Sequence, residues 1–183
     1  MINAYIFSTE LGHAALVWDA ENDELSRVFL PYDSLDRLRS DIQEAFASIN
    51  LAKVDIPNWI ETLSFDMKAY YRGEMEISEI TLAAPLNLKR FTEFQRKVYE
   101  TLKTTKSNEI LSYKALAEMC GKPKAARAVG SCMARNPFPL LIPCHRVVTT
   151  SGKLGNFTAD TGVKLKEKMQ LLDQRGKTVQ KIL

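Results

Sequence analysis

The chain has 183 residues, of which 45% are hydrophobic and 26% charged, values typical of a folded protein with one domain or two small ones. It contains no run of roughly 18 apolar residues, which argues against a membrane-spanning helix. Its first residues lack the basic region and the small-residue cleavage site of a secretion signal. The chain has three cysteines, an odd number. Together with the features above, this number favours a reducing compartment, so we expect the cytoplasm or the nucleus.

Charge is divided unevenly along the chain, although the formal net charge is only +3. Residues 1–85 contain 6 Lys/Arg and 15 Asp/Glu, whereas residues 86–183 contain 19 Lys/Arg and 7 Asp/Glu. Such asymmetry indicates that the basic half binds a polyanion; the alternative is two solvated domains of opposite sign that attract one another. Because the basic half also carries a helix-turn-helix pattern, nucleic acid is the favoured partner.

The first half has the pattern of an α+β domain. Three runs of apolar residues bounded by short polar turns predict an antiparallel three-stranded sheet with strands over 4–8, 14–18 and 25–30. Ser34 is a suitable N-cap for a first helix, and a second helix is expected over 61–71, ending at Gly73.

An extended stretch around Pro85 separates this region from the rest. We therefore expect an N-terminal α/β domain in residues 1–85 and a second domain in residues 86–183. The second domain opens with a capping box, Thr92 at the N-cap and Gln95 three residues later, which predicts a helix.

The middle of the second domain has the pattern of a winged helix-turn-helix. Ser112 is a candidate N-cap for a short helix that Gly121 ends, and a second short helix is predicted over 124–135. Two short helices across a glycine-containing turn form a helix-turn-helix. Residues 147–152 would form the wing, and a last helix is expected over 163–174.

Cys144 is the candidate nucleophile. A thiol attacks only as the thiolate, and a free cysteine is mostly protonated at neutral pH. His145 and Arg146 are neighbours that could lower the pKa of Cys144, and Pro143 fixes the backbone just before it. The alternative is a buried and inert cysteine on a core strand, since free cysteine is among the most buried residue types.

Five motifs follow one another in a specific order and spacing: Ser-Tyr-Lys-Ala-Leu-Ala with Tyr113, Ala-Ala-Arg-Ala-Val-Gly from Ala125 to Gly130, Asn136-Pro137, Pro-Cys-His-Arg-Val with Cys144, and Gly-Asn-Phe from Gly155 to Phe157. Together they resemble the O6-alkylguanine-DNA alkyltransferases (methylated-DNA–protein-cysteine methyltransferases). The resemblance is strong from about Phe91 to Asn156 and weak before Tyr70. It implies direct-reversal DNA repair without a cofactor, in which an alkyl group moves from O6 of guanine to a protein cysteine. O4 of thymine is a second candidate target.

The resemblance implies catalytic roles for four residues. Cys144 would be the nucleophile and His145, acting through a water, the general base. Asn136 would hold the cysteine loop by hydrogen bonds, and the Tyr113 hydroxyl would protonate the leaving guanine. Because the thioether product is stable, one event would consume the protein, which we expect to act as a monomer.

The resemblance also implies how double-stranded DNA carrying O6-alkylguanine is bound. The second helix of the helix-turn-helix would enter the minor groove, where Arg127 fills the space of a flipped nucleotide and Tyr113 presses on its phosphate. Lys114, Lys122 and Thr150 would contact backbone phosphates. The flipped base would lie in a pocket formed by Met133, Pro139, Val147, Phe157 and Thr158.

One position departs from the family pattern. The family usually orients the histidine with a glutamate in Leu-Leu-x-x-Glu-Gly, but Arg175 occupies that place here. Either Glu167 or Asp173 substitutes from another helical position, or His145 lacks an anionic partner and transfer is slower. The altered acid keeps open an alternative function, an alkyltransferase-like protein that binds the lesion without repairing it.

No metal or cofactor is expected. The N-terminal region has no cysteine and a single histidine, His13, and the spacing of Cys120, Cys132 and Cys144 matches no metal motif. A plain winged-helix regulator would not need Pro-Cys-His-Arg. A Cys-His hydrolase is disfavoured because adjacent side chains on a strand point to opposite faces.

Overall fold

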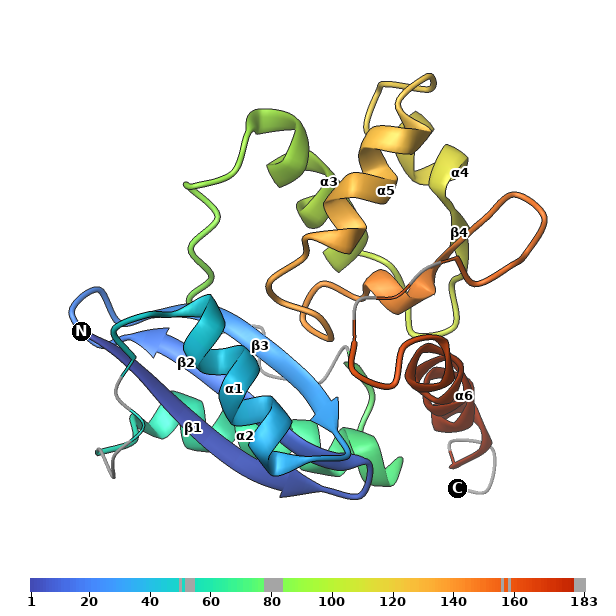
Figure 1. Cartoon of the computed structure of the whole chain (residues 1–183). Coiled ribbons are helices and arrows are strands. Elements are labelled where there is room, and N and C mark those ends of the chain that lie inside the picture. Colours follow the sequence, from blue (N-terminus) through green and yellow to red (C-terminus); the bar gives the residue numbers. More distant parts are fainter. Residues whose placement is uncertain (50, 52–54, 78–83, 156, 158, 180–183) are drawn as a thin grey trace. The chain divides into compact units, whose positions relative to one another are not determined.

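The computed structural model describes residues 1–49, 51, 55–77, 84–155, 157 and 159–179, and for residues 175–179 it describes the backbone alone. The chain forms two compact units (Figure 1). The first unit comprises Met1–Asn87 and Ala159–Thr161, and the second comprises Leu88–Thr158 and Gly162–Leu183. The sequence placed the boundary at Pro85 and did not suggest that a short later segment belongs to the first unit.

The first unit is built on an antiparallel sheet in the order β1-β2-β3, which confirms the predicted three-stranded sheet. The strands are β1 (Ile2–Thr9), β2 (Gly12–Asp19) and β3 (Glu24–Tyr32). Gly12 begins β2 with φ +116°, and a Cβ at this position would lie 2.3 Å from the carbonyl oxygen of Tyr32. Only glycine therefore fits at this hairpin.

Helices cover both faces of this sheet (Figure 1). α1 (Leu35–Ala45) is capped by the hydroxyl of Ser34, as predicted, and packs Leu38 and Ile42 onto the sheet. With both faces covered, the central strand β2 buries five consecutive residues, Ala14–Trp18. This double burial explains why the sequence of β2 is a continuous apolar run and not an alternating one.

α2 spans Asn58–Arg72 and begins before its predicted start. Gly73 follows it with φ +75°, the left-handed C-cap expected from the sequence. Within the same unit, the buried carboxylate of Asp160 pairs with Arg37 of α1 at 2.6 Å. This ion pair helps to hold Ala159–Thr161 in the first unit.

The second unit begins with α3 (Glu93–Lys103), whose predicted capping box is present. The Thr92 hydroxyl accepts from the amide of Gln95 at 3.3 Å, and the Gln95 side-chain oxygen accepts from the amide of Thr92 at 3.0 Å. These two bonds satisfy amides that the first helical turn cannot pair.

α4 (Tyr113–Met119) and α5 (Ala126–Ala134) form the predicted helix-turn-helix. Ser112 caps α4 by accepting from the amide of Ala115 at 3.0 Å. α5 begins later than predicted, because the amide of Ala125 first closes a separate turn onto the carbonyl of Lys122.

β4 (Leu111–Ser112) and β5 (Val147–Val148) form a two-stranded parallel sheet. Tyr113 directly follows β4 and Thr149 directly follows β5, so the pairing of the strands brings these two residues close together. The start of α4 is thereby fixed beside the segment that follows Cys144.

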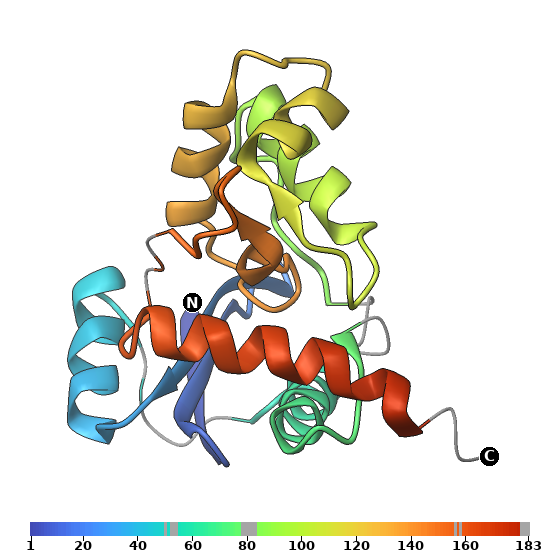
Figure 2. The same cartoon turned by 90° about the vertical axis from the view of Figure 1, so that its right-hand side faces the viewer.

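α6 (Val163–Val179) extends beyond its predicted end and is seen lengthwise in Figure 2. It packs against the turn that carries Cys144. Its buried residues include the apolar Leu165 and Met169 but also Lys166 and Asp173. Within the part of the chain that the structure describes, no helix combines the length and the apolar character needed to cross a membrane.

Candidate active site

Cys144 lies at the start of a one-turn 3-10 helix, η2 (Cys144–Arg146), and not on the strand considered from the sequence. The amide of Cys144 donates to the carbonyl of Ile142 at 2.7 Å, and that of Arg146 donates to the carbonyl of Pro143 at 2.9 Å. Successive residues of a 3-10 helix project about 120° apart, so Cys144 and His145 leave the backbone in different directions. Cys144 is 6% exposed.

Asn136 holds the loop that leads to Cys144. Its Nδ2 donates to the carbonyl of Ile142 at 2.8 Å, and its Oδ1 accepts from the amide of Phe138 at 3.0 Å. Within this loop Leu140 has φ +76°, a conformation that costs a non-glycine residue on the order of 1–3 kcal/mol. The two bonds of Asn136 help to hold the loop in this strained shape.

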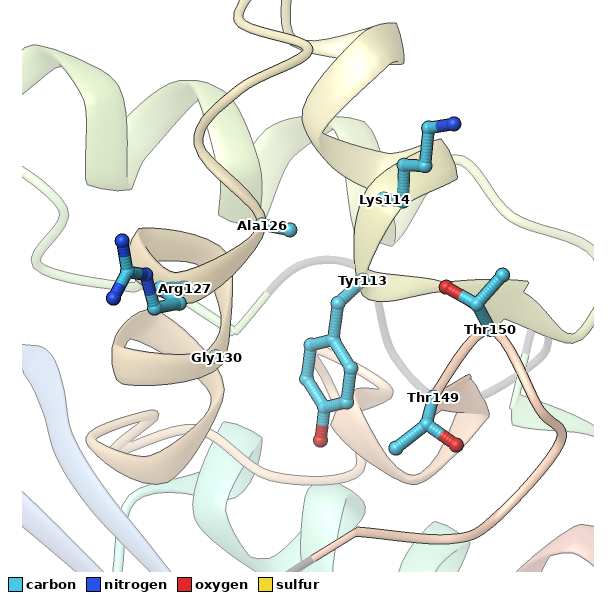
Figure 3. Close-up of a pocket in the computed structure, with 7 residues that line it drawn as sticks. All are labelled: Tyr113, Lys114, Ala126, Arg127, Gly130, Thr149 and Thr150. Atoms are coloured by element: carbon cyan, nitrogen blue, oxygen red, sulfur yellow. The ribbon is translucent and has the colours of Figure 1, made fainter.

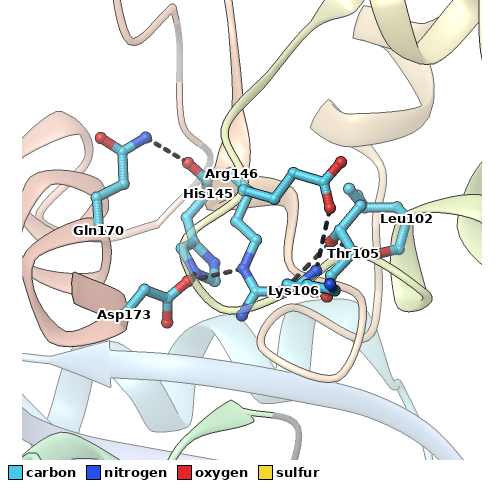
Figure 4. A network of polar contacts seen from close by, with 8 residues as sticks. Leu102, Thr105, Lys106, His145, Arg146, Gln170 and Asp173 are labelled. Atoms are coloured by element: carbon cyan, nitrogen blue, oxygen red, sulfur yellow. Dashed lines mark hydrogen bonds and ion pairs between the residues drawn. The ribbon is translucent and has the colours of Figure 1, made fainter. Parts of the chain in front are cut away.

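His145 is hydrogen bonded to a buried acid (Figure 4). Its Nε2 lies 3.0 Å from Oδ2 of Asp173, and the same oxygen accepts from Nε of Arg146 at 2.7 Å. Arg146 also donates through Nη1 to the carbonyl of Thr105 at 2.8 Å. Of the acids considered from the sequence, Asp173 is thus the partner of His145, whereas Glu167 is exposed on α6.

These contacts decide which nitrogen of His145 is basic. Burial lowers the pKa of the imidazole, and the hydrogen bond to Asp173 opposes this effect only in part. Burial acts to raise the pKa of the Asp173 carboxyl, but the bonds from His145 and Arg146 hold it below its usual value. A neutral imidazole beside a carboxylate donates through Nε2, which leaves the lone pair on Nδ1. Nδ1 is buried and has no hydrogen-bond partner among the described residues, so it is the atom that can accept a proton.

The surroundings of Cys144 do not lower its pKa, contrary to the expectation from its neighbours. Burial raises the pKa of the thiol, and the Asn136 side chain and the charge of Lys166 offset only part of this effect. The expected contributions of His145 and Arg146 are small because the imidazole is neutral and the guanidinium is paired with Asp173. Cys144 is therefore a thiol that needs a base to react.

α6 brings three polar side chains to the site. Lys166, Gln170 and Asp173 are spaced by four and three residues, which places them on one face of the helix. Gln170 Nε2 donates to the carbonyl of His145 at 2.6 Å, and Lys166 Nζ donates to the carbonyl of Val147 at 2.7 Å. Of these three residues, only Asp173 is a candidate from the sequence pattern. A polar stripe within a mostly apolar helix face is the signal that could have found the other two.

An open pocket of about 430 Å³ lies beside Tyr113 in the second unit (Figure 3). It is lined by Tyr113, Lys114, Ala126, Arg127, Gly130, Thr149 and Thr150. The Tyr113 ring stands between α5 and Thr149, and Arg127 extends from α5 away from the ring. The predicted DNA-binding residues Tyr113, Lys114, Arg127 and Thr150 thus come together. Lys122 does not line the pocket, and its Nζ lies 5.0 Å from the ring centroid of Phe94.

Of the residues predicted to hold a flipped base, the four that the structure describes do not line this open pocket. Met133, Pro139 and Val147 are buried. Phe157 is partly exposed, and its ring centroid lies 5.8 Å from Lys166 Nζ. Thr158 lies outside the described residues.

The three cysteines, Cys120, Cys132 and Cys144, are buried free thiols. No group of three or more His, Cys, Asp and Glu side chains that could hold a metal ion occurs among the described residues. His13, on β2, lies 3.3 Å from the hydroxyl of Ser8.

The burial of neutral His145 predicts a pH-dependent stability. The free energy of unfolding is expected to fall as the pH drops below about 6.5, the ordinary pKa of histidine. Because folding lowers the pKa of His145, the unfolded chain binds the proton first, and stability is lost as the pH falls toward the folded-state pKa. One proton gives a slope of at most about 1.4 kcal/mol per pH unit, which urea unfolding at several pH values measures.

One variant tests whether His145 causes this slope. His145→Gln is expected to flatten the dependence below about pH 6.5. Asp173 acts in the same direction but only below about pH 4, since its pKa is lowered by folding. An unchanged slope in His145→Gln would contradict the assignment.

Comparison with known proteins confirms the family resemblance that the motifs indicate. Residues 93–177 match the family model described as 6-O-methylguanine DNA methyltransferase, DNA binding domain. A methylated-DNA–protein-cysteine methyltransferase of Kluyveromyces lactis is 40% identical over 125 residues, which cover 68% of this chain and 64% of that protein. One of Methanosarcina barkeri is 35% identical over 129 residues, which cover 67% of this chain and 77% of that protein.

A solved structure covers both units. The crystal structure of Mycobacterium tuberculosis OGT in complex with DNA matches with a TM-score of 0.70 and 25% identity over 94% of this chain and 93% of that one. The chain belongs to the O6-methylguanine-DNA methyltransferase family. The matched part is less than two thirds of the length of the Kluyveromyces lactis protein.

Proposed function

We propose that the protein repairs DNA by direct reversal, moving an alkyl group from O6 of guanine in double-stranded DNA to Sγ of Cys144. The observation that carries this proposal is the buried pair between His145, the residue after Cys144, and Asp173 of α6. A buried thiol needs a base, and Nδ1 of the neutral imidazole has no partner among the described residues. The family of the chain and its basic second half support the same function.

The transfer conserves protons and electrons. Through one water, His145 Nδ1 takes the proton of the Cys144 thiol, and the thiolate attacks the alkyl carbon from the side opposite O6. The carbon–sulfur bond forms as the carbon–O6 bond breaks, and the electron pair stays on guanine. Tyr113 donates a proton to the leaving base. Burial raises the pKa of Tyr113, which keeps this proton in place at neutral pH.

The thioether product has no route to hydrolysis at the site. Each protein molecule therefore acts once and is consumed. We expect it to act as a monomer. O4 of alkylated thymine, which presents the same alkyl-oxygen bond, is a second substrate of this chemistry.

We assign the open pocket beside Tyr113 to duplex DNA. α5 enters the minor groove, where the small side chains of Ala126 and Gly130 permit close approach and Arg127 fills the space of the flipped nucleotide. Phosphates are bound by Lys114, Lys122 and Thr150, so affinity is expected to fall steeply with salt. The flipped base is held by Met133, Pro139, Val147, Phe157 and Thr158.

The burial of Cys144 favours a second candidate function, a protein that binds the lesion without repairing it. The thiol is 6% exposed and its pKa is raised, which are the properties of an unreactive cysteine. The base and acid next to it favour the transferase, because a protein that only binds the lesion has no use for a proton acceptor.

Repair stoichiometry tests the function. With an excess of duplex that carries one O6-methylguanine, the protein is expected to remove one lesion per molecule and then stop. Cys144→Ala should bind the same duplex and remove none, whereas Cys132→Ala, at another buried thiol, should repair like the wild type. Removal of many lesions per molecule would contradict the single-event mechanism, and binding without removal by the wild type would support the second candidate.

A further inference from the structure

Lys166 is a buried cation for which the proposed mechanism gives no role. Its side chain on α6 is 1% exposed. Nζ donates to the carbonyl of Val147 at 2.7 Å and to the carbonyl of Leu154, and it lies 5.8 Å from the ring centroid of Phe157. Lys166 thus joins the strand that follows Cys144 to the loop that carries Phe157.

This loop is packed closely against Tyr113. Gly155, the residue after Leu154, has φ +65°, and a Cβ at this position would lie 3.0 Å from the Tyr113 hydroxyl oxygen. A shift of the Leu154 carbonyl would therefore move backbone that lies close to the proposed proton donor. The hydrogen bonds of Lys166 act on both sides of the site, at Cys144 through Val147 and at Tyr113 through Leu154.

The hydrogen-bond partners of Lys166 leave its charge without a counter-ion. Both are backbone carbonyls, and no carboxylate pairs with Lys166 among the residues that the structure describes, whereas Arg146 pairs with Asp173. A buried ammonium is unfavourable unless an opposite charge or full hydrogen bonding compensates it. Burial lowers the pKa of Lys166, and the charge that opposes this effect is that of Cys144 in its thiolate form.

The stabilisation between the Lys166 ammonium and the Cys144 thiolate is reciprocal. The charge of Lys166 favours the Cys144 thiolate, and it disfavours the His145 imidazolium. In the resting site His145 is neutral and Cys144 is a thiol, so Lys166 is the uncompensated charge of the three. Loss of the thiol proton creates the negative charge that compensates it.

We propose that Lys166 is a positioning residue that holds Val147 and Leu154 on the two sides of the site and supplies the counter-charge of the Cys144 thiolate. The charge pair Lys166–Cys144 forms when the thiol proton moves to His145, and it disappears when Sγ becomes a neutral thioether. The proposal rests on the proposed function only in using this thiolate for alkyl transfer.

Reactivity of Cys144 in the absence of DNA tests the proposal. The rate of carboxamidomethylation by iodoacetamide is measured at each pH from the mass of the Cys144 peptide, in the wild type and in Lys166→Gln. Glutamine keeps a donor for one carbonyl but has no charge. The other groups that are coupled to the charge of Cys144, and that remain constant, are Tyr99, Tyr113, the Asn136 amide and the backbone of His145.

We expect the pH of half-maximal reactivity to rise by about one unit or more in Lys166→Gln, as for loss of a nearby opposite charge. Lys166→Arg, which keeps the charge, should remain near the wild-type value. Lys168→Gln, the same change at an exposed lysine of α6, should show no shift. Near-UV circular dichroism establishes that each variant is folded, and Lys166→Met is the second neutral variant if Lys166→Gln does not fold.

An unshifted profile in a folded neutral variant would overturn the proposal, and so would a shift of equal size in Lys166→Arg or Lys168→Gln. Because iodoacetamide needs neither DNA nor a lesion, this result is independent of whether the protein repairs guanine. Where repair is observed, Lys166→Gln should slow transfer near neutral pH by about tenfold or more while the affinity for the lesion-bearing duplex stays the same. A loss of affinity with an unchanged transfer rate would count against the assigned role.

Discussion

Asp173→Asn is expected to slow alkyl transfer by about a hundredfold or more, because general base catalysis contributes on the order of 10²–10⁴ to a rate. Asp173 contacts Nε2 of His145, and in the proposed mechanism it orients the ring and is the anionic partner of the imidazolium that forms when the thiol proton moves. The same change also leaves Arg146 buried beside a neutral amide. Breaking a buried pair in this way costs about 3–5 kcal/mol of stability, so transfer is measured by single-turnover kinetics at a temperature where the variant is folded.

Two variants of α6 distinguish the role of Asp173 from a general effect of charge. Glu167→Gln removes an exposed carboxylate from the same helix and should transfer at the wild-type rate. Asp173→Glu keeps the charge and should retain much of the activity, provided that Arg146 accommodates the longer side chain. Equal rates in Asp173→Asn and Glu167→Gln would show that the acid beside His145 has no part in transfer.

Arg127→Ala is expected to slow transfer from duplex DNA by about 10- to 100-fold while affecting single-stranded DNA much less. Flipping a nucleotide from a duplex costs a few kcal/mol in lost stacking and pairing, and a side chain that fills the space offsets part of this cost. Arg127 is exposed on α5 at the edge of the open pocket, where it is free to enter a groove. The measurement is the ratio of single-turnover rates on duplex and single-stranded substrates that carry the same lesion.

Arg135→Ala is the matched control for this prediction. Arg135 is also exposed, at the other end of α5, and it does not line the pocket; its Nε donates to the carbonyl of Ser131 at 3.3 Å. Its removal should leave the ratio of the two rates unchanged. If Arg127→Ala reduces both rates equally, Arg127 contributes to binding and not to extrusion.

Features that depend on neighbouring residues were predictable from the sequence. The N-caps Ser34, Thr92 and Ser112 were each identified, because a cap needs only a hydroxyl and the amides of the next turn. The ends of helices and strands that depend on partners distant in the sequence were less predictable. β3 continues to Tyr32, beyond its predicted end, because Tyr32 still pairs with His13 of β2.

The site was predictable where its residues are close in the chain. Asn136, Cys144 and His145 lie in two neighbouring motifs, whereas the residues of α6 that contact His145 lie more than twenty residues later. The sequence pattern pointed to the place of Arg175 for the acid, but the acid that contacts His145 is Asp173, and the Arg175 side chain lies outside the described residues. The face of α6 that meets the site is set by packing, which residue spacing alone does not reveal.

The burial of the side chains at the site was the property least predictable from the sequence. Histidine and arginine are usually exposed or partly exposed, yet His145 and Arg146 are at least nine-tenths buried here, as is Cys144. Their burial reverses the expected effect on the thiol, because desolvation raises its pKa more than the nearby groups lower it. The direction of this shift could not be derived without knowing the packing around the motif.

The most direct test of the account is to locate the transferred group. The protein is mixed with a duplex that carries an isotope-labelled methyl group on O6 of guanine, and the label is mapped by peptide mass spectrometry. The account predicts one label per molecule, on Cys144 and not on Cys120 or Cys132, and none in Cys144→Ala. Tight binding of the lesion with no label on the protein would contradict alkyl transfer and would identify a protein that binds the damage without repairing it.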